Sequence, residues 1–89
     1  MNFEFQKSFE KSLDKLKDTK LRNAISDVVK NIQRASVLNE IKNIKKLTGF
    51  KTAYRIKVMQ DYRMGIIYQN NTIYIVDFSH RKDIYKKFP

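Results

Sequence analysis

The chain has 89 residues, enough for one small domain with a single core, and we expect one domain over residues 1–89. The absence of cysteine and the presence of one histidine exclude disulfides, thiolate metal sites and most zinc or iron centres, so we expect neither a metal nor a cofactor. A formal net charge of +10, from 19 Lys and Arg against 9 Asp and Glu, favours an anionic partner: nucleic acid first, an acidic protein second and a membrane surface third.

The chain is predicted to begin with a short strand followed by a helix. Aromatic and polar residues alternate over Asn2–Phe5, which favours a strand with Phe3 and Phe5 facing inward. This start lacks the basic and apolar regions of a signal peptide, and no later stretch is long and apolar enough to span a membrane, so we expect a cytoplasmic protein. From about residue 6 the apolar residues follow helical spacing, at Phe9, Leu13 and Leu16.

A second amphipathic helix is predicted to pack antiparallel to the first. Asp18 or Thr19 is placed to cap its N-terminus. Its buried stripe is expected to consist of Leu21, Ile25, Val28, Val29 and Ile32. The next segment is expected to be an irregular connection that docks Ile44 and Leu47 and ends at Gly49.

Residues 54–68 are predicted to form a β-hairpin, because apolar and basic residues alternate on both sides of a polar interruption. With a three-residue loop at 59–61, one face collects the apolar positions Tyr54, Ile56, Val58, Tyr62, Met64 and Ile66. Arg55, Lys57 and Arg63 then share the other face, with Lys57 directly opposite Arg63. Like charges across a sheet are mildly destabilising. The pair therefore suggests a bound anion, although a solvated strand face explains it equally well.

The last strand and the C-terminal segment complete the predicted fold. Asn70 and Asn71 suit a tight turn with positive φ. The almost continuous apolar run 72–78 favours a strand covered on both faces, which we place centrally beside the N-terminal strand. Residues 79–89 are too charged for a core, so we expect a loop with one helical turn. The predicted fold class is α+β: a short N-terminal strand, a two-helix hairpin and a three-stranded antiparallel meander packed on the helices.

Chain order brings three more polar side chains toward the basic face of the hairpin. His80, Arg81 and Tyr85 follow the strand that pairs with residues 62–69, so an imidazole, a guanidinium and a phenol are expected near the cationic pair. Each side chain also has a simpler explanation. His80 suits a surface or capping position, Arg81 is ordinary in an exposed loop, and Tyr85 suits the core.

Five short segments, taken in order, carry a family resemblance. They are Leu47-Thr48-Gly49, Tyr54-Arg55-Ile56-Lys57-Val58, Asp61-Tyr62-Arg63-Met64, Ile67-Tyr68 and His80-Arg81-Lys82-Asp83-Ile84-Tyr85. Together with the length, the two N-terminal helices, the C-terminal meander and the positive charge, they resemble the RelE/ParE superfamily of bacterial toxins from type II toxin–antitoxin pairs. The resemblance extends over the whole chain. The C-terminal one of the five segments favours the RelE-like branch, with a fold like that of microbial ribonucleases.

The resemblance implies a toxin that acts as a ribosome-dependent endoribonuclease, cutting messenger RNA codons in the ribosomal A site without a metal. It also implies silencing by a cognate antitoxin, binding to operator DNA only through the antitoxin complex, and no membrane partner. The residues that match the family's catalytic site are Lys57, Arg63, His80, Arg81 and Tyr85. Those expected to bind RNA are Arg55, Lys82 and Lys86.

The implied reaction sets three tasks: removing the 2′-hydroxyl proton, stabilising the charge on the phosphorane and protonating the leaving 5′-oxygen. Arg63 and Arg81 suit the second task because guanidinium forks grip phosphate oxygens, and the matched tyrosine suits stacking on a base. Arg55 stands where some members have lysine, and arginine keeps its proton, so proton transfer falls on Lys57 or His80. Both an amine and an imidazole can transfer a proton, so both candidates stay open.

Two other functions are compatible with the sequence. A ParE-like toxin that inhibits DNA gyrase without cutting RNA shares the fold but does not need this histidine, arginine and tyrosine together. A non-catalytic basic domain that binds RNA or DNA is allowed by composition alone. Neither the preferred codon nor the oligomeric state is encoded in a pattern that the sequence displays.

Overall fold

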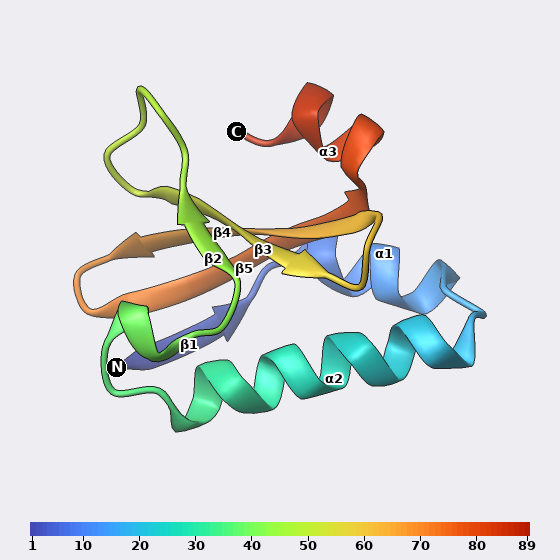
Figure 1. Cartoon of the computed structure of the whole chain (residues 1–89), viewed down its shortest axis with the longest axis horizontal. Coiled ribbons are helices and arrows are strands. Elements are labelled where there is room, and N and C mark those ends of the chain that lie inside the picture. Colours follow the sequence, from blue (N-terminus) through green and yellow to red (C-terminus); the bar gives the residue numbers. More distant parts are fainter.

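The computed structural model describes residues 1–89 and has three layers (Figure 1). A five-stranded sheet separates two helices on one face from a short helix on the other. The elements in chain order are β1 (Asn2–Phe5), α1 (Lys7–Lys15), α2 (Thr19–Arg34), the 3₁₀ helix η1 (Leu38–Glu40), β2 (Ile44–Lys46), β3 (Ala53–Val58), β4 (Tyr62–Gln69), β5 (Thr72–His80) and α3 (Arg81–Lys87). The strand order is β1-β5-β4-β3-β2, with β1 parallel to β5 and the other pairs antiparallel. The predicted α+β class is confirmed, with β5 beside the N-terminal strand.

The main core lies between the sheet and the pair α1 and α2. On α2 the buried side chains are Leu21, Ile25 and Ile32, and Val28 and Val29 are partly buried, as predicted. Asp18 caps α2, because its Oδ1 accepts a hydrogen bond from the Leu21 amide at 3.2 Å. None of the helices has the length and apolar character needed to span a membrane.

The β3–β4 hairpin has the predicted register. Val58 pairs with Tyr62 across a three-residue loop, and the apolar face packs on the main core. Met59 takes the left-handed position of that loop with φ 56°, although glycine or asparagine is usual there. Asn70 and Asn71 form the β4–β5 turn with φ of 53° and 57°, as predicted. The hairpin therefore turns its basic face toward α3.

Two features differ from the prediction: a strand at the edge of the sheet and the position of a phenylalanine near the N-terminus. The segment expected to be irregular contains β2, in which Ile44 pairs with Ile56 and extends the sheet by one edge strand. This strand is only three residues long, so an alternating pattern has no room to show, and its two lysines suit an exposed edge. Phe5, predicted to face inward, is 43% exposed because it lies at the end of β1, where its ring stacks on Phe9 with centroids 5.5 Å apart.

The charged C-terminal segment also forms more structure than predicted. Instead of a loop with one turn, it forms the seven-residue helix α3, which packs on the sheet face opposite to α1 and α2. Ile84 is 0% and Phe88 4% exposed, and both pack with Ala53 in a second small core. Phe88 directly follows α3 and packs with Ile84 against the sheet, while the charged side chains around them stay in solvent.

Candidate nucleic-acid interface

The sheet register builds a basic surface on the α3 side. Lys57 on β3 lies directly opposite Arg63 on β4, as the parity of the sequence predicted. One rung further along β3, Arg55 lies between Lys45 on β2 and Gly65 on β4. The sheet thus carries two cross-strand pairs of like charge, Lys57 with Arg63 and Lys45 with Arg55. Such pairs are mildly destabilising unless an anion lies between the two cations.

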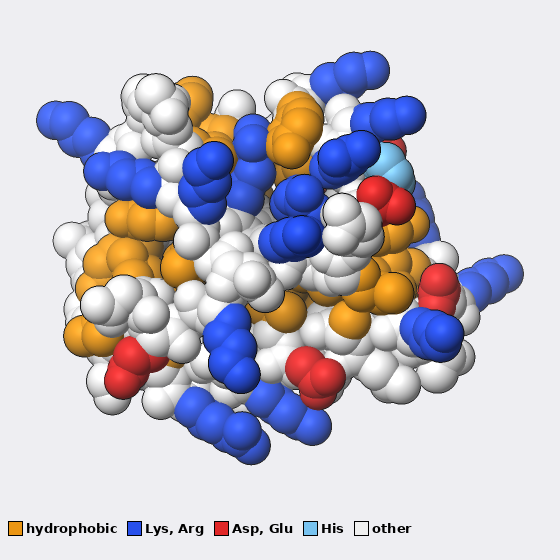
Figure 2. All heavy atoms as spheres, in the orientation of Figure 1, with side chains coloured by type: hydrophobic (Ala, Val, Ile, Leu, Met, Phe, Trp, Pro, Cys, Tyr) orange, Lys and Arg blue, Asp and Glu red, His pale blue; other side chains and the backbone are white.

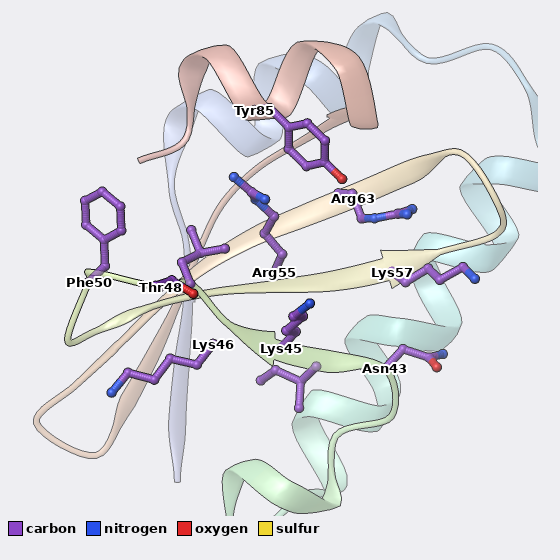
Figure 3. Close-up of a pocket in the computed structure, with 11 residues that line it drawn as sticks. Asn43, Lys45, Lys46, Thr48, Phe50, Arg55, Lys57, Arg63 and Tyr85 are labelled. Atoms are coloured by element: carbon purple, nitrogen blue, oxygen red, sulfur yellow. The ribbon is translucent and has the colours of Figure 1, made fainter.

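These rungs form the floor of a cleft of about 610 Å³, a size typical of ligand sites. The loop between β2 and β3 forms one wall and α3 the other (Figure 3). Its lining includes Lys45, Phe50, Arg55, Lys57, Arg63 and Tyr85. Figure 2 shows Lys and Arg side chains gathered over this part of the molecule. None of the lining residues is acidic, so the cleft attracts anions.

Arg55 and Tyr85 support each other at the α3 wall. The Arg55 Cζ lies 4.3 Å from the centroid of the Tyr85 ring, which is a cation–π contact. The Arg55 Nη2 donates to the carbonyl oxygen of Phe88 at 3.4 Å, and its Nε is buried without a hydrogen-bond partner. Tyr85 itself is 53% exposed. Arg55 therefore holds the ring in place while leaving much of it accessible to a nucleobase.

Two guanidinium groups lie at the loop of the β3–β4 hairpin. The Arg63 Nη1 donates to the carbonyl oxygens of Gln60 at 3.0 Å and Tyr62 at 2.8 Å, which leaves Nη2 and Nε for a ligand. The Arg81 amide donates to the Asp61 carbonyl at 2.7 Å, and its Nε lies 4.0 Å from Asp61 Oδ1. Both side chains of that ion pair are about half exposed, so it holds Arg81 only weakly.

His80 lies on the other side of the sheet. It pairs with Tyr62, which belongs to the core-facing set, and the two rings are 5.6 Å apart. Its Nδ1 accepts a hydrogen bond from the Lys82 amide at 3.2 Å and so caps α3, the simpler of its two predicted roles. The structure thus gathers Arg55, Lys57, Arg63 and Tyr85 in the cleft. The predicted site residues outside its lining are His80, Arg81, Lys82 and Lys86.

Lys45 and Phe50 line the cleft but were not predicted to be site residues. Lys45 is assigned to the basic face only once β2 is known to pair with β3. For Phe50 the signal was available, because it follows Gly49 and such a turn can present a side chain to solvent. No group of three or more His, Cys, Asp or Glu side chains gathers as metal ligands.

Gly65 allows α3 to pack closely on the sheet. A Cβ at this position would lie 2.6 Å from the Phe88 Cδ2. We expect Gly65→Ala to push the Phe88 ring outward and to lower the free energy of unfolding by about 1–3 kcal/mol. Urea titration followed by circular dichroism measures the loss, with Gln69→Ala at the exposed end of β4 as the control. A Gly65→Ala protein as stable as the control variant would contradict the observed packing of Phe88.

Comparison with known proteins assigns the family. No protein-family profile matches the chain. A relative named toxin RelE3, from Methanocaldococcus jannaschii, is 37% identical over 86 residues, which cover 96% of each protein. A chain in the crystal structure of a RelB–RelE antitoxin–toxin complex from Methanococcus jannaschii is 36% identical, with a TM-score of 0.76 over 96% of this chain and 98% of that one. The YoeB dimer from Staphylococcus aureus shares the fold at 21% identity, with a TM-score of 0.68 over 86% of this chain and 92% of that one.

The fold is therefore that of a small toxin. The chain belongs to the RelE family, the toxin components of type II toxin–antitoxin systems. The family resemblance predicted from the five sequence segments is confirmed.

Proposed function

We propose that this toxin is an endoribonuclease that cuts messenger RNA in the ribosomal A site. The observation that carries the proposal is the Lys57–Arg63 pair on the floor of the cleft, with Tyr85 standing over it from α3. This arrangement provides a phosphate site beside an aromatic ring, the combination that unpaired RNA requires. Membership of the RelE family and the net charge of +10 support the same conclusion.

In the proposed reaction the 2′-oxygen attacks the adjacent phosphorus and the bond to the 5′-oxygen breaks. The leaving 5′-oxygen takes up a proton from water, and the products are a 2′,3′-cyclic phosphate and a 5′-hydroxyl end, so no external nucleophile is needed. Arg63 binds the non-bridging oxygens and stabilises the added charge of the phosphorane, with Arg81 assisting from the N-terminus of α3, next to Asp61 of the hairpin loop. Tyr85 stacks on a base and aligns the 2′-oxygen for in-line attack.

Lys57 is our choice for the residue that takes the 2′-hydroxyl proton. Its side chain is exposed on the cleft floor opposite Arg63. His80, the other candidate, pairs on the core-facing side of the sheet, and its Nδ1 already accepts a hydrogen bond from a backbone amide. Arg55 contributes charge and the support of Tyr85.

The proposed partners follow from the family and from the charge. Solved relatives include toxins bound to the antitoxins RelB and DinJ, and we infer that a cognate antitoxin silences this chain. The basic surface suits the phosphates of the ribosome and of messenger RNA. We expect contact with operator DNA only through the antitoxin complex.

The proposal is tested by incubating the purified toxin with ribosomes stalled on a defined messenger RNA and mapping the new ends by primer extension. We expect cuts within the A-site codon that carry 5′-hydroxyl ends and cyclic phosphates. Lys57→Ala should slow cutting about 100-fold or more, whereas His80→Gln should cut at nearly the wild-type rate. Intact messages together with inhibition of DNA gyrase would overturn the proposal in favour of a ParE-like action.

A further inference from the structure

We propose that the cleft contains a second RNA subsite, formed by Phe50 and Lys45, which holds the nucleotide next to the scissile phosphate. Phe50 stacks on the base of that nucleotide, and Lys45 binds its phosphate together with Arg55. This inference rests on the proposed function and extends it from one nucleotide to two. It assigns a role to the wall of the cleft that lies opposite α3.

The Phe50 ring is presented by a well-defined turn. The Phe50 amide donates to the Leu47 carbonyl at 3.3 Å, and the Leu47 amide donates to the Ala53 carbonyl at 2.9 Å, which closes the loop. Gly49 has φ 86°, a conformation that residues with a side chain rarely adopt. The ring is nevertheless 49% exposed, so the turn holds an aromatic surface in solvent instead of burying it.

Phe50 and Tyr85 flank the same cations. The two rings stand on either side of Arg55, one from the β2–β3 loop and one from α3 (Figure 3). A single exposed aromatic ring is ordinary on a protein surface. Two exposed rings bordering one basic cleft are the arrangement by which proteins hold successive bases of a single strand.

The cations below the rings have the spacing of an RNA backbone. Lys45 lies opposite Arg55, two residues along β3 from the Lys57–Arg63 rung. Two residues of a strand advance by about 6.6 Å, which is close to the distance between adjacent phosphates of an extended RNA strand. Each rung therefore offers one phosphate a pair of cations, and no carboxylate lines the cleft to oppose them.

The first test uses Phe50→Trp, because the chain has no tryptophan of its own. The ligand is a tetranucleotide with 2′-O-methyl groups, which cannot be cut by 2′-oxygen attack. We expect the fluorescence of the new indole to be quenched on titration, since stacked bases quench it. Met59→Trp places an exposed indole on the hairpin loop, outside the cleft lining, and should show no comparable quenching.

The second test measures affinity and cleavage without a probe. Phe50→Ala should weaken binding of the tetranucleotide about five- to tenfold and leave the midpoint of thermal unfolding unchanged. Val37→Ala removes another exposed apolar side chain outside the cleft and should change neither quantity. Lys45→Ala should lower the slope of log affinity against log salt by about 0.7, and Lys11→Ala on α1 should not.

The outcomes separate this inference from the proposed function. If the wild-type toxin cuts messenger RNA but Phe50→Ala binds and cuts like the wild type, the subsite is absent and the function stands. If the wild-type toxin cuts nothing and Phe50→Ala still weakens binding, Phe50 and Lys45 form an RNA-binding subsite in a cleft that does not cut RNA, and the nuclease proposal fails. Failure of the free toxin to bind the tetranucleotide, or no quenching in Phe50→Trp, also overturns the inference.

Discussion

Replacing Arg63 with alanine is expected to lower the rate of messenger RNA cleavage about 100- to 1,000-fold. The Arg63 side chain is anchored through Nη1 to two carbonyls of the hairpin loop, so its remaining donors already point in a fixed direction before RNA arrives. Donors arranged in advance stabilise the transition state without reorganisation. Lys57 would then face the phosphorane without its cross-strand partner.

Single-turnover kinetics on stalled ribosomes measure this loss, with matched variants to interpret it. Arg63→Lys keeps the charge but cannot grip two oxygens at once, so we expect it to recover only part of the rate. Arg34→Ala removes an exposed guanidinium from α2, outside the cleft, and should cut at nearly the wild-type rate. Equal rates for Arg63→Ala and Arg34→Ala would show that Arg63 binds no reacting phosphate.

The basic floor of the cleft could be predicted because the hairpin is local. The faces of Arg55, Lys57 and Arg63 depend only on the period of two and on the number of residues in the loop. Both are visible in the sequence, and the observed register is the predicted one. For the same reason α2 was predicted correctly, because the spacing of its apolar residues and its capping residue both lie within one short segment.

The position of His80 depends on an irregularity that the sequence does not display. Counting from the Asn70-Asn71 turn, an unbroken ladder pairs Arg63 with Phe78 and turns His80 toward the basic face. The register shifts between Gly65 and Ile66, so that Arg63 pairs instead with Ser79. The bulge therefore places Phe78 in the core. His80 lies on the same core-facing side of the sheet, opposite to the basic face.

The helix α3 was missed because its apolar residues are few and its partners are distant. Ile84 and Phe88 are separated by a tyrosine and two lysines, and they pack on Ala53, about thirty positions earlier in the chain. The close approach also needs Gly65, where Phe88 occupies the space of the absent side chain. Neither requirement is visible within the C-terminal segment, whose composition alone favours a solvated loop.

Ile84→Ala is expected to lower the free energy of unfolding by about 2–5 kcal/mol and to reduce cleavage as well. Ile84 is 0% exposed, and its small core is separated from the main core by the sheet. Losing its side chain should therefore free α3 before the rest of the chain unfolds. Tyr85 is the next residue on that helix, and its contact with Arg55 should be lost together with the docking of α3.

Hydrogen exchange distinguishes this local effect from a general loss of stability. In Ile84→Ala the amides of α3 should exchange fast while those of β4 and β5 stay protected. Ile32→Ala removes an isoleucine side chain that is also buried, at 2% exposed, on α2 in the main core. It should lower global stability by a similar amount yet keep the cleft and its cleavage rate. If the two variants lost activity in parallel, α3 would not be an independently docked wall of the cleft, and the position of Tyr85 would depend on the main core instead.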